Sequence, residues 1–422
     1  MRTGVWFGLS TLLPCACAEP RAPLEPVPSP PGVAESARAV PTTSVSAAPT
    51  VTALEPATPT AKRERVVGIT FGEDHACALR SGGGVTCWGS NRDNRTGVGS
   101  GISEVVAPTS VRGVADAVSV VAAYDHSCAA LRGGRLACWG AAQHLVGADP
   151  DPADGPVISK TEEHVVELAS TGSELLARLD DGQVRMWESL TSRMYFLGPG
   201  MKPPKSWCDG CIVPNLKNVI LVASGFNTHC AVHADHTLSC FGGNEYGQLG
   251  RGKAEPVAEG TLPPRTPSKV TALSHVSEVS VSSHVCARLD DGHVACWGKN
   301  DHGQVGDGST ATRMRPVTLS GLDRVTHVAV GRDTSCAIRD DGSVWCWGLN
   351  DEGQLGDGTS SDRHVPTPVG GVTGAVKLAL GPAGACAIRS DGEIWCWGFW
   401  DLRRKTAKER EEKSREPVRV PW

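Results

Sequence analysis

Pairs of cysteines ten residues apart recur six times along the chain and constrain its fold more than any other feature. Between the members of one pair lies Asp340-Asp341-Gly342, flanked by β-branched, aromatic and small residues, which is typical of a β-hairpin with a three-residue loop. Hairpin register then places Cys336 opposite Cys346 at a non-hydrogen-bonded site, where Cα atoms lie about 4.5 Å apart. The expected disulfides join Cys77 with Cys87, Cys128 with Cys138, Cys230 with Cys240, Cys286 with Cys296, Cys336 with Cys346 and Cys386 with Cys396.

A seventh copy of this hairpin lacks cysteines. Leu176 and Met186 occupy the two cysteine positions around Asp181-Gly182. The copies follow one another at intervals of roughly fifty residues, which is the spacing of solenoids and β-propellers.

The number of cysteines, sixteen, favours an oxidising compartment, because a spacing of ten is not that of a zinc site. Each short bridged loop is expected to contribute about 2 to 3 kcal/mol to stability. The net charge of -5 and the pI near 6.2 argue against a nucleic-acid partner, since phosphate binding needs a clustered basic surface.

Residues 1–17 resemble a bacterial lipoprotein signal peptide, with Arg2, an apolar stretch and then small residues and cysteines. Cys17, after Ala16, is the expected lipidation site, because Cys15 follows a proline; an ordinary secretory signal is the alternative. Residues 18–63 are rich in Pro, Ala, Ser and Thr and are expected to form a disordered tether. The protein is therefore expected to be exported and lipid-anchored at the outer membrane or cell surface, or otherwise periplasmic or secreted.

Residues 64–422 are expected to form one domain of seven repeats. Each repeat contains a short alternating strand, the hairpin, a Trp-Gly pair, a glycine-rich loop and a Pro-Val strand. Four strands per repeat make one antiparallel blade, and seven blades close into an all-β, seven-bladed propeller without exposed sheet edges. The final Pro-Val strand, at Pro417 and Val418, completes the seventh blade.

The repeat resembles that of the regulator of chromosome condensation family. The resemblance is carried by the motifs His-x-Cys-Ala-Leu, Asp-Gly-x-Val-x-Cys-Trp-Gly and Asn-x-x-Gly-Gln-Leu-Gly-Asp-Gly, and it is strongest to the cysteine-paired form in secreted bacterial proteins. The resemblance implies a seven-bladed propeller that binds partners through loops on its faces. The family's best-known role, nuclear guanine-nucleotide exchange, does not fit an acidic, exported and disulfide-rich chain.

Several motifs have both a structural and a chemical interpretation. His75, His126 and His284 occupy equivalent positions and are expected to make structural hydrogen bonds to backbone, with metal binding as the alternative. The loops at residues 300–308 and 350–358 are rich in oxygen ligands, but they lack the closing Glu of an EF-hand, so turns with positive φ explain their glycines better. Trp345 and Trp347 are expected to pack between neighbouring blades.

The repeat is broken in two places. Residues 189–214 replace the glycine-rich loop of the third repeat and contain Cys208 and Cys211, which are expected to form a small structural bridge. Residues 401–416 replace the seventh loop with mixed charge. The candidate partner-binding residues at these breaks are Trp207, Asp209 and Trp400.

These features together predict a noncatalytic, monomeric, surface-tethered propeller that binds an unknown protein partner and needs no metal or cofactor. The membrane is involved only through the lipid anchor. Two alternatives remain open. One is a carbohydrate or envelope-ligand module that uses exposed Trp side chains, and the less favoured one is an enzyme.

Overall fold

A computed structural model describes residues 64–141, 155–160, 163–170, 172, 174–188, 209–256, 266–399 and 414–420. These residues belong to a compact unit that spans residues 61–422. The expected signal peptide, the lipidation site Cys17 and the tether at 18–63 lie outside the described residues, so those expectations stay predictions.

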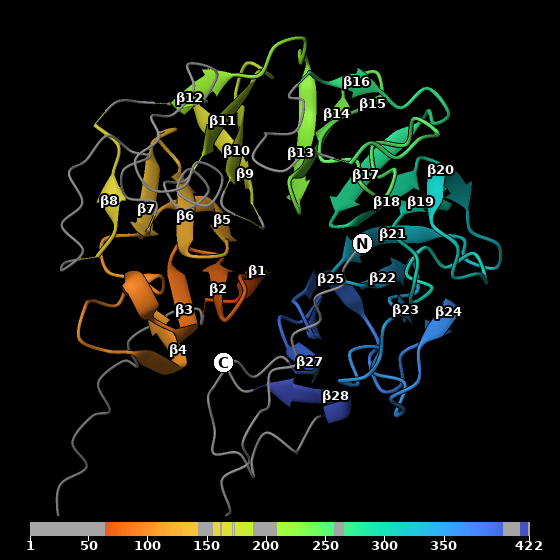
Figure 1. The fold of residues 1–422 in the computed structure, drawn as a ribbon. Helices are drawn as coiled ribbons and strands as arrows, with labels where there is room; N and C mark the ends of the chain where they lie inside the picture. The colour runs from red at the N-terminus through yellow and green to blue at the C-terminus, as the bar shows by residue number, and fades with distance from the viewer. Residues whose placement is uncertain are drawn as a thin grey trace, which may run out of the picture. The chain divides into compact units, whose positions relative to one another are not determined.

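The chain forms a seven-bladed β-propeller with four-stranded antiparallel blades, as the sequence predicts (Figure 1). In every blade the four strands are consecutive in sequence, and each pairs with the next. Blade 1 contains β1 (Val66–Phe71), β2 (His75–Arg80), β3 (Val85–Ser90), the 3-10 helix η1 (Arg92–Asn94) and β4 (Glu104–Ser110). Blade 2 contains β5 (Ala117–Ala122), β6 (His126–Leu131), β7 (Leu136–Gly140) and β8 (Val157–Ile158). Blade 3 contains β9 (Val165–Ala169), β10 (Glu174–Leu179), β11 (Val184–Glu188) and β12 (Asp209–Ile212).

The remaining four blades follow the same plan, with the first strand innermost and the fourth outermost (Figure 1). Blade 4 contains β13 (Val219–Gly225), β14 (Thr228–His233), β15 (Leu238–Gly242) and β16 (Ser268–Lys269). Blade 5 contains β17 (Val276–Val281), β18 (His284–Leu289), β19 (Val294–Gly298) and β20 (Arg313–Thr318). Blade 6 contains β21 (Val325–Val330), β22 (Thr334–Arg339), β23 (Val344–Gly348) and β24 (Arg363–Pro368). Blade 7 contains β25 (Ala375–Leu380), β26 (Gly384–Arg389), β27 (Ile394–Gly398) and β28 (Ser414–Val420).

The central hairpin of each blade has the predicted register. In blade 6, Cys336 lies opposite Cys346, and Gly342 closes the turn with a φ of 75°. The same pairing of opposite cysteines occurs in the hairpins of blades 1, 2, 4, 5 and 7. A three-residue turn whose last residue lies in the left-handed region therefore sets the register; that residue is glycine in six blades and His236, with a φ of 60°, in blade 4.

All six expected disulfides are formed. The Cα atoms lie 4.1 Å apart in five of them and 4.2 Å apart in the bridge of blade 5. The bridging cysteines are buried, so the disulfides lie inside the blades rather than on their surface. In chain order the bridges join Cys77 with Cys87, Cys128 with Cys138, Cys230 with Cys240, Cys286 with Cys296, Cys336 with Cys346 and Cys386 with Cys396.

The innermost strands carry a feature that the sequence analysis missed. The pairing of the first two strands shifts at the start of the innermost strand, as between Val66 and Gly68 in blade 1 and between Val325 and His327 in blade 6. A bulge of this kind increases local twist.

The ring closes by packing of side chains between the first and last blades. Val66, Ala78 and Trp88 of blade 1 share a hydrophobic cluster with residues of blade 7, including Ile388 and Cys396. Blade 1 is built from β1 to β4 and blade 7 from β25 to β28, so no strand from one end of the described chain joins the blade at the other end. The outer edges carry proline on several blades (Pro108, Pro316, Pro366 and Pro417), which discourages pairing with another chain.

Blade 3 keeps its fold without a disulfide in its hairpin. Leu176 lies opposite Met186, and both side chains are fully buried in a cluster shared with blade 4. The predicted 189–214 loop is shorter than expected, because residues 209–212 form the outer strand β12. Cys211, in that strand, is disulfide-bonded, and its predicted partner Cys208 lies outside the described residues.

Among the described residues, no helix has the length and apolar character needed to cross a bilayer.

Candidate partner-binding face

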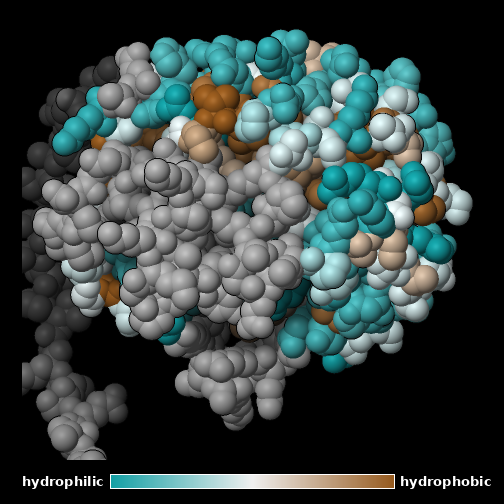
Figure 2. Space-filling view, turned by 45° about the horizontal axis from the view of Figure 1, so that its top comes forward, coloured by the Kyte–Doolittle hydropathy of each residue, from teal (hydrophilic) through white to brown (hydrophobic). Residues whose placement is uncertain are grey.

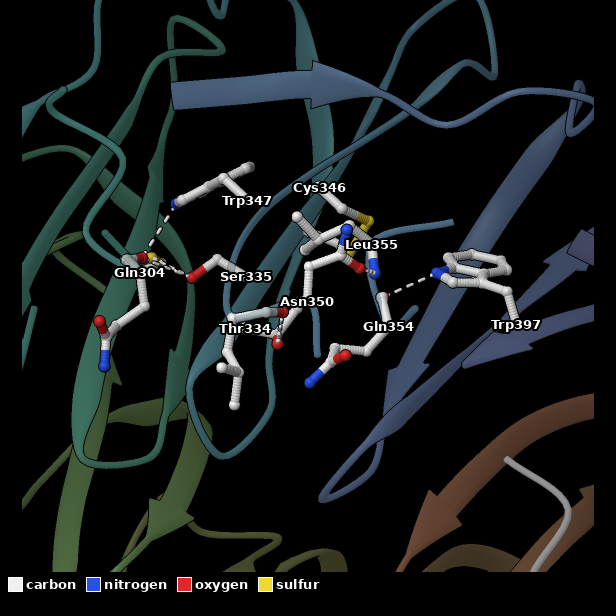
Figure 3. Close-up of a disulfide and its surroundings, with 12 residues drawn as sticks. Gln304, Thr334, Ser335, Cys346, Trp347, Asn350, Gln354, Leu355 and Trp397 are labelled. Carbon is white, nitrogen blue, oxygen red and sulfur yellow. Dashed lines mark hydrogen bonds between the residues drawn. A yellow bond between two sulfur atoms is a disulfide. The ribbon is translucent and has the colours of Figure 1, made fainter. Parts of the chain in front are cut away.

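The repeat residues hold neighbouring blades together (Figure 3). The Trp347 indole Nε1 of blade 6 donates a hydrogen bond of 2.9 Å to the backbone oxygen of Gln304, in the loop of blade 5. The same bond joins Trp297 to Gln248 and Trp397 to Gln354, at 2.8 and 2.9 Å. The predicted packing of Trp347 between blades is thus confirmed, and the Gly-Gln-Leu-Gly motif supplies its acceptor.

An asparagine organises each of these loops from inside. Asn350 Oδ1 accepts a hydrogen bond of 3.0 Å from the Leu355 backbone N–H, while its Nδ2 donates to the Ser361 carbonyl at 3.0 Å (Figure 3). The loop carboxylates are also engaged within the loop, since Asp357 pairs with Arg363 at 2.8 Å. The oxygen atoms of these loops therefore stabilise turns, which is the structural interpretation made from the sequence.

The equivalent histidines do not bond to backbone, and that prediction was wrong in its detail. His75 Nε2 of blade 1 lies 2.8 Å from Ser127 Oγ of blade 2, and His284 Nε2 of blade 5 lies 2.7 Å from Ser335 Oγ of blade 6. His126 instead bonds through Nδ1 to the adjacent Asp125 carboxylate at 2.8 Å. A serine hydroxyl of the next blade, and not a backbone group, is therefore the partner of His75 and of His284.

Burial changes the ionisation of two of these histidines. Desolvation is the main cause that lowers the pKa of His75 to about 3, and the Arg95 guanidinium lowers it further. Desolvation also lowers the pKa of His284, to about 4. Both imidazoles are therefore neutral near pH 7 and are placed to accept or donate a hydrogen bond across a junction.

The junction between blades 3 and 4 has a polar contact at the same positions. His229 Nε2 lies 2.8 Å from Glu174 Oε2, and His229 Nδ1 lies 2.9 Å from Ser224 Oγ. Ser, His and Glu are also the groups of nucleophilic hydrolases. Here, however, His229 is 2% exposed and Ser224 is 9% exposed, so the arrangement joins two blades rather than facing a substrate.

Polar groups on the innermost strands also bridge blades. Glu278 of blade 5 accepts a hydrogen bond of 3.1 Å from the Val328 N–H of blade 6 and pairs with His327 at 2.6 Å. Ser280 accepts a further bond of 3.0 Å from the Val330 N–H. These groups satisfy the free edge of the innermost strand, which is why polar residues occur inside the ring.

One face of the propeller carries the loops between the first and second and between the third and fourth strands of each blade. We call it the long-loop face; its described loops are residues 72–74, 91–103, 123–125, 226–227, 243–256, 282–283, 299–312, 331–333, 349–362 and 381–383. The hairpin turns around residues 81–84, 132–135, 180–183, 234–237, 290–293, 340–343 and 390–393 lie on the opposite face, which we call the turn face.

The loop between the first and second strands carries a different residue at one equivalent position in each blade. We call the first cysteine of each hairpin, or Leu176 in blade 3, the first bridging position. The residue four places before it is different in every blade, and we call these seven residues the inner-loop tips. They are Glu73, Tyr124, Gly172, Phe226, Ser282, Arg332 and Pro382. The seven residues at this position differ in size, polarity and charge.

Several of the tips converge. Arg332 of blade 6 lies 3.7 Å from the Glu73 carboxylate of blade 1, and its guanidinium carbon lies 6.0 Å from the centre of the Phe226 ring of blade 4. Ser282 and Ser283 donate to the Arg332 backbone oxygen at 3.4 and 3.2 Å. The tips of four blades thus form one contact group.

A small cavity of about 70 Å³ lies among these tips. Its apolar lining includes Phe71, Val281 and Leu380, and its polar lining includes Glu73 and Arg332. By a comparable measure a single water needs only about 10 to 15 Å³. The cavity is therefore large enough for one small apolar side chain of a partner, but not for a cofactor.

Three aromatic side chains of the long-loop face are exposed, and one of them, Phe226, lines the cavity. Tyr124 and Phe226 are each 51% exposed, and Tyr246 of the blade 4 loop is 41% exposed. Aromatic side chains supply large contact area and are enriched in protein interfaces. Elsewhere, in the view of Figure 2, the described hydrophobic residues lie as small separate areas between hydrophilic ones.

Of the candidate partner-binding residues chosen from the sequence, Asp209 alone is among those that the structure describes. Trp207 and Trp400 lie outside the described residues, so their role stays a prediction. Asp209 begins the outer strand β12, where it pairs in register with Trp187. The structure instead brings together Glu73, Phe226 and Arg332, which the sequence analysis did not single out.

A signal for these residues was present in the sequence. When the seven repeats are aligned on the first bridging position, seven different residue types occur at the tip position, and the same is true of the hairpin-turn position at residues 84, 135, 183, 237, 293, 343 and 393.

No group of three or more His, Cys, Asp or Glu side chains in the described part of the chain is arranged to hold a metal ion.

Models of the regulator of chromosome condensation repeat match this chain in several places. One model matches residues 66–95, 219–248 and 325–354, and a second matches residues 235–289, 291–338 and 341–388. The matched repeats are therefore similar to regulator of chromosome condensation repeats, as the sequence analysis expected.

Curated relatives share the repeat region. The chain is 28% identical over 284 residues to the E3 ubiquitin-protein ligase HERC2 of Homo sapiens, covering 63% of this chain and 6% of HERC2. It is 28% identical over 279 residues to the ultraviolet-B receptor UVR8 of Arabidopsis thaliana, covering 63% of this chain and 61% of UVR8. The match spans less than two thirds of either relative.

Solved structures agree on the fold. Prp20p of Saccharomyces cerevisiae, studied for its binding to Gsp1p and histones, aligns with a TM-score of 0.60 at 22% identity and covers 72% of this chain and 76% of its own. A structure of the yeast protein bound to Kap60 gives a TM-score of 0.66 at 19% identity and covers 85% of this chain and 84% of its own. At this identity the likeness supports the propeller fold alone.

Proposed function

We propose that this propeller of regulator of chromosome condensation repeats is a noncatalytic module that binds a partner protein through the centre of its long-loop face. The observation that carries the proposal is the convergence of Glu73, Phe226 and Arg332 around an apolar cavity, at a repeat position that differs in every blade. A rigid ring presents such tips with little loss of conformational freedom on binding.

The relatives are consistent with this role. Prp20p, which shares the fold, is described by its binding to Gsp1p, histones and Kap60, all of which are proteins. The ligase name of HERC2 refers to a much longer protein, of which only 6% matches this chain. For these reasons binding, rather than catalysis, is the activity we assign to the repeats.

Export is part of the same proposal. Six buried disulfides favour an oxidising compartment, and the sequence of residues 1–17 resembles a lipoprotein signal with Cys17 as its lipidation site. A partner is then to be sought in the cell envelope or outside the cell.

The test is affinity capture from envelope extract and spent medium, with the oxidised full chain, its Tyr124→Ser/Phe226→Ser variant and a Val365→Ser control. Val365 is 52% exposed on the outer strand β24, so the control removes a similar exposed apolar group away from the tips. The proposal expects one protein to be retained by the wild type and the control and lost by the tip variant. Retention by the tip variant would overturn it.

A carbohydrate ligand is the second candidate, because Tyr124 and Tyr246 offer exposed rings on the same face. A glycan array with the same three proteins separates the two. Saccharide binding that is lost in the tip variant, together with the absence of a captured protein, would favour this second function.

A further inference from the structure

The charges of the long-loop face are unevenly paired around the central cavity. The basic side chains in the described loops of blades 4 to 6 all lie in ion pairs. Lys299 pairs with Asp333 at 2.9 Å, Arg332 with Glu73 at 3.7 Å, and Arg251 and Lys253 both pair with Glu255, at 3.0 and 2.6 Å.

Three further carboxylates of the same loops are exposed, so the four cations face six carboxylates in all, an excess of two negative charges. Glu245, Asp301 and Asp351 each follow the asparagine that organises its loop. Asp301 also lies 3.4 Å from Lys299, but it shares that cation with Asp333, so the group as a whole remains negative.

A buried glutamine orients each of the three carboxylates. The glutamine lies three residues later in the loop, and its amide donates a hydrogen bond of 3.2, 3.2 and 3.0 Å, from Gln248, Gln304 and Gln354 respectively. Because the repeat places these carboxylates at equivalent positions in three successive blades, they form an arc, which we call the acidic arc.

We propose that the partner contacts this face with a basic segment that carries an apolar side chain, which enters the central cavity. This inference rests on the proposed binding function and specifies the chemistry of the partner. The cavity accepts the apolar group, and the acidic arc attracts Lys or Arg on either side of it. Charges arranged in this way raise the rate of association and select against acidic partners.

The aromatic tips suit the same partner. Arg332 already lies over the face of Phe226, which is a cation–π arrangement within the chain. Tyr124 has a 51% exposed side chain and no cation over its ring among the described contacts, so an incoming Lys or Arg can stack there.

The test uses a random peptide library displayed on phage and selected against the oxidised full chain at about 0.01 M salt, where the Debye length is about 30 Å. Peptides that are enriched are synthesised, and their dissociation constants are measured by fluorescence anisotropy at about 0.01 M and about 0.15 M salt. The expected winners combine Lys or Arg with an adjacent aliphatic or aromatic residue, and they bind more weakly at the higher salt.

Three variants locate the interaction. Glu245→Gln/Asp301→Asn/Asp351→Asn neutralises the acidic arc and is expected to weaken binding by at least about tenfold at low salt. Asp181→Asn/Asp291→Asn/Asp341→Asn changes the net charge equally on the turn face and is expected to leave binding unchanged. Tyr124→Ser/Phe226→Ser is expected to abolish binding.

Each outcome decides something different. Two outcomes overturn the basic-partner inference but leave the binding face in place. In one, the peptides depend on Tyr124 and Phe226 but are not enriched in Lys or Arg. In the other, the two charge variants weaken binding equally. Peptides that are unaffected by the tip variant overturn both proposals. A basic, salt-sensitive set that is lost with the arc and with the tips supports both.

Discussion

The junction between blades 5 and 6 and the inner-loop tips use the same repeat in opposite ways. At the junction, recurring residues make fixed contacts: Trp347 bonds to Gln304, His284 bonds to Ser335, and all four are buried. At the tips, Phe226 and Arg332 are half exposed and have no counterpart of the same type in any other blade. Recurrence within this chain therefore indicates which residues join blades, and its loss indicates which residues are free to specify a partner.

The largest expected effect is on the junction. Trp347→Ala removes a fully buried indole and its hydrogen bond, and should lower the free energy of unfolding by about 3 to 5 kcal/mol in urea. Trp345→Ala, two residues away in the same strand but only partly buried, is the control and should cost about 1 to 2 kcal/mol. Equal losses of unfolding free energy in the two variants would show that the junction tryptophan contributes no more to stability than its partly buried neighbour.

The disulfides come next. Cys336→Ser/Cys346→Ser should lower stability by about 2 to 3 kcal/mol, since the bridge closes a short loop in the unfolded chain. Urea unfolding of the variant and of the oxidised wild type measures the loss. An unchanged midpoint would mean that buried packing alone holds the hairpin.

The converse experiment is in blade 3, where Leu176 and Met186 lie directly opposite each other. Leu176→Cys/Met186→Cys is expected to form a further bridge, measured as the absence of free thiol, with a higher thermal midpoint when oxidised than when reduced. Free thiols in the folded variant would mean that blade 3 departs from the geometry of the other blades.

A matched pair of glycines isolates one contact of the junction. Gly306 and Gly308 both have a φ of 84°, but a Cβ on Gly306 would lie 2.6 Å from Trp347 Nε1, whereas one on Gly308 would lie 3.7 Å from Val365 Cγ1. Both alanine variants should lose about 1 to 2 kcal/mol from the backbone conformation.

Gly306→Ala should lose more than Gly308→Ala, because the tryptophan must move to admit the methyl group. Urea unfolding of both variants measures the difference. An equal decrease in unfolding free energy for both variants would mean that the backbone conformation alone causes it.

The polar junctions make stability depend on pH. The unfolded chain binds protons on His75 and His284 below about pH 6.5, whereas the folded chain does so only at a pKa of about 3 and about 4. Stability from these groups is thus present above pH 6.5 and is lost as the pH falls toward those values.

Between about pH 6.5 and about pH 5 the loss should be on the order of 2 kcal/mol for each histidine, at about 1.36 kcal/mol per pH unit. Thermal midpoints of the wild type and of His75→Gln/His284→Gln, compared at the two pH values, should show a smaller decrease in the variant. Identical decreases would remove these histidines as the cause.

The smallest effect is expected at the tips. Tyr124→Ser/Phe226→Ser removes two half-exposed rings that are not part of the blade cores, so the free energy of unfolding should change by no more than about 0.5 kcal/mol. Loss of binding with an unchanged urea midpoint would show that the tips serve binding, whereas the blade junctions serve stability. A large loss of stability would mean that the tips also hold the ring together.

The sequence was sufficient wherever the contacts are local. The register of Cys336 with Cys346 follows from the length of one turn, and the period of the repeat then predicts the number of blades and their strand order. It was insufficient for the partners of His75 and His284, because those bonds cross to another blade. It also pointed to Trp207 and Trp400 as binding residues, and these lie outside the described part of the chain.

What the sequence by itself determined is the blade, because a hairpin, its disulfide and its glycine turns depend on residues within about a dozen positions of one another. What only the tertiary structure decided is the meeting of Glu73, Phe226 and Arg332, which are far apart in the chain and come together at the axis of the ring. Their proximity depends on how blades tilt and close, and that is set by the summed packing of all the junctions rather than by any one stretch of sequence.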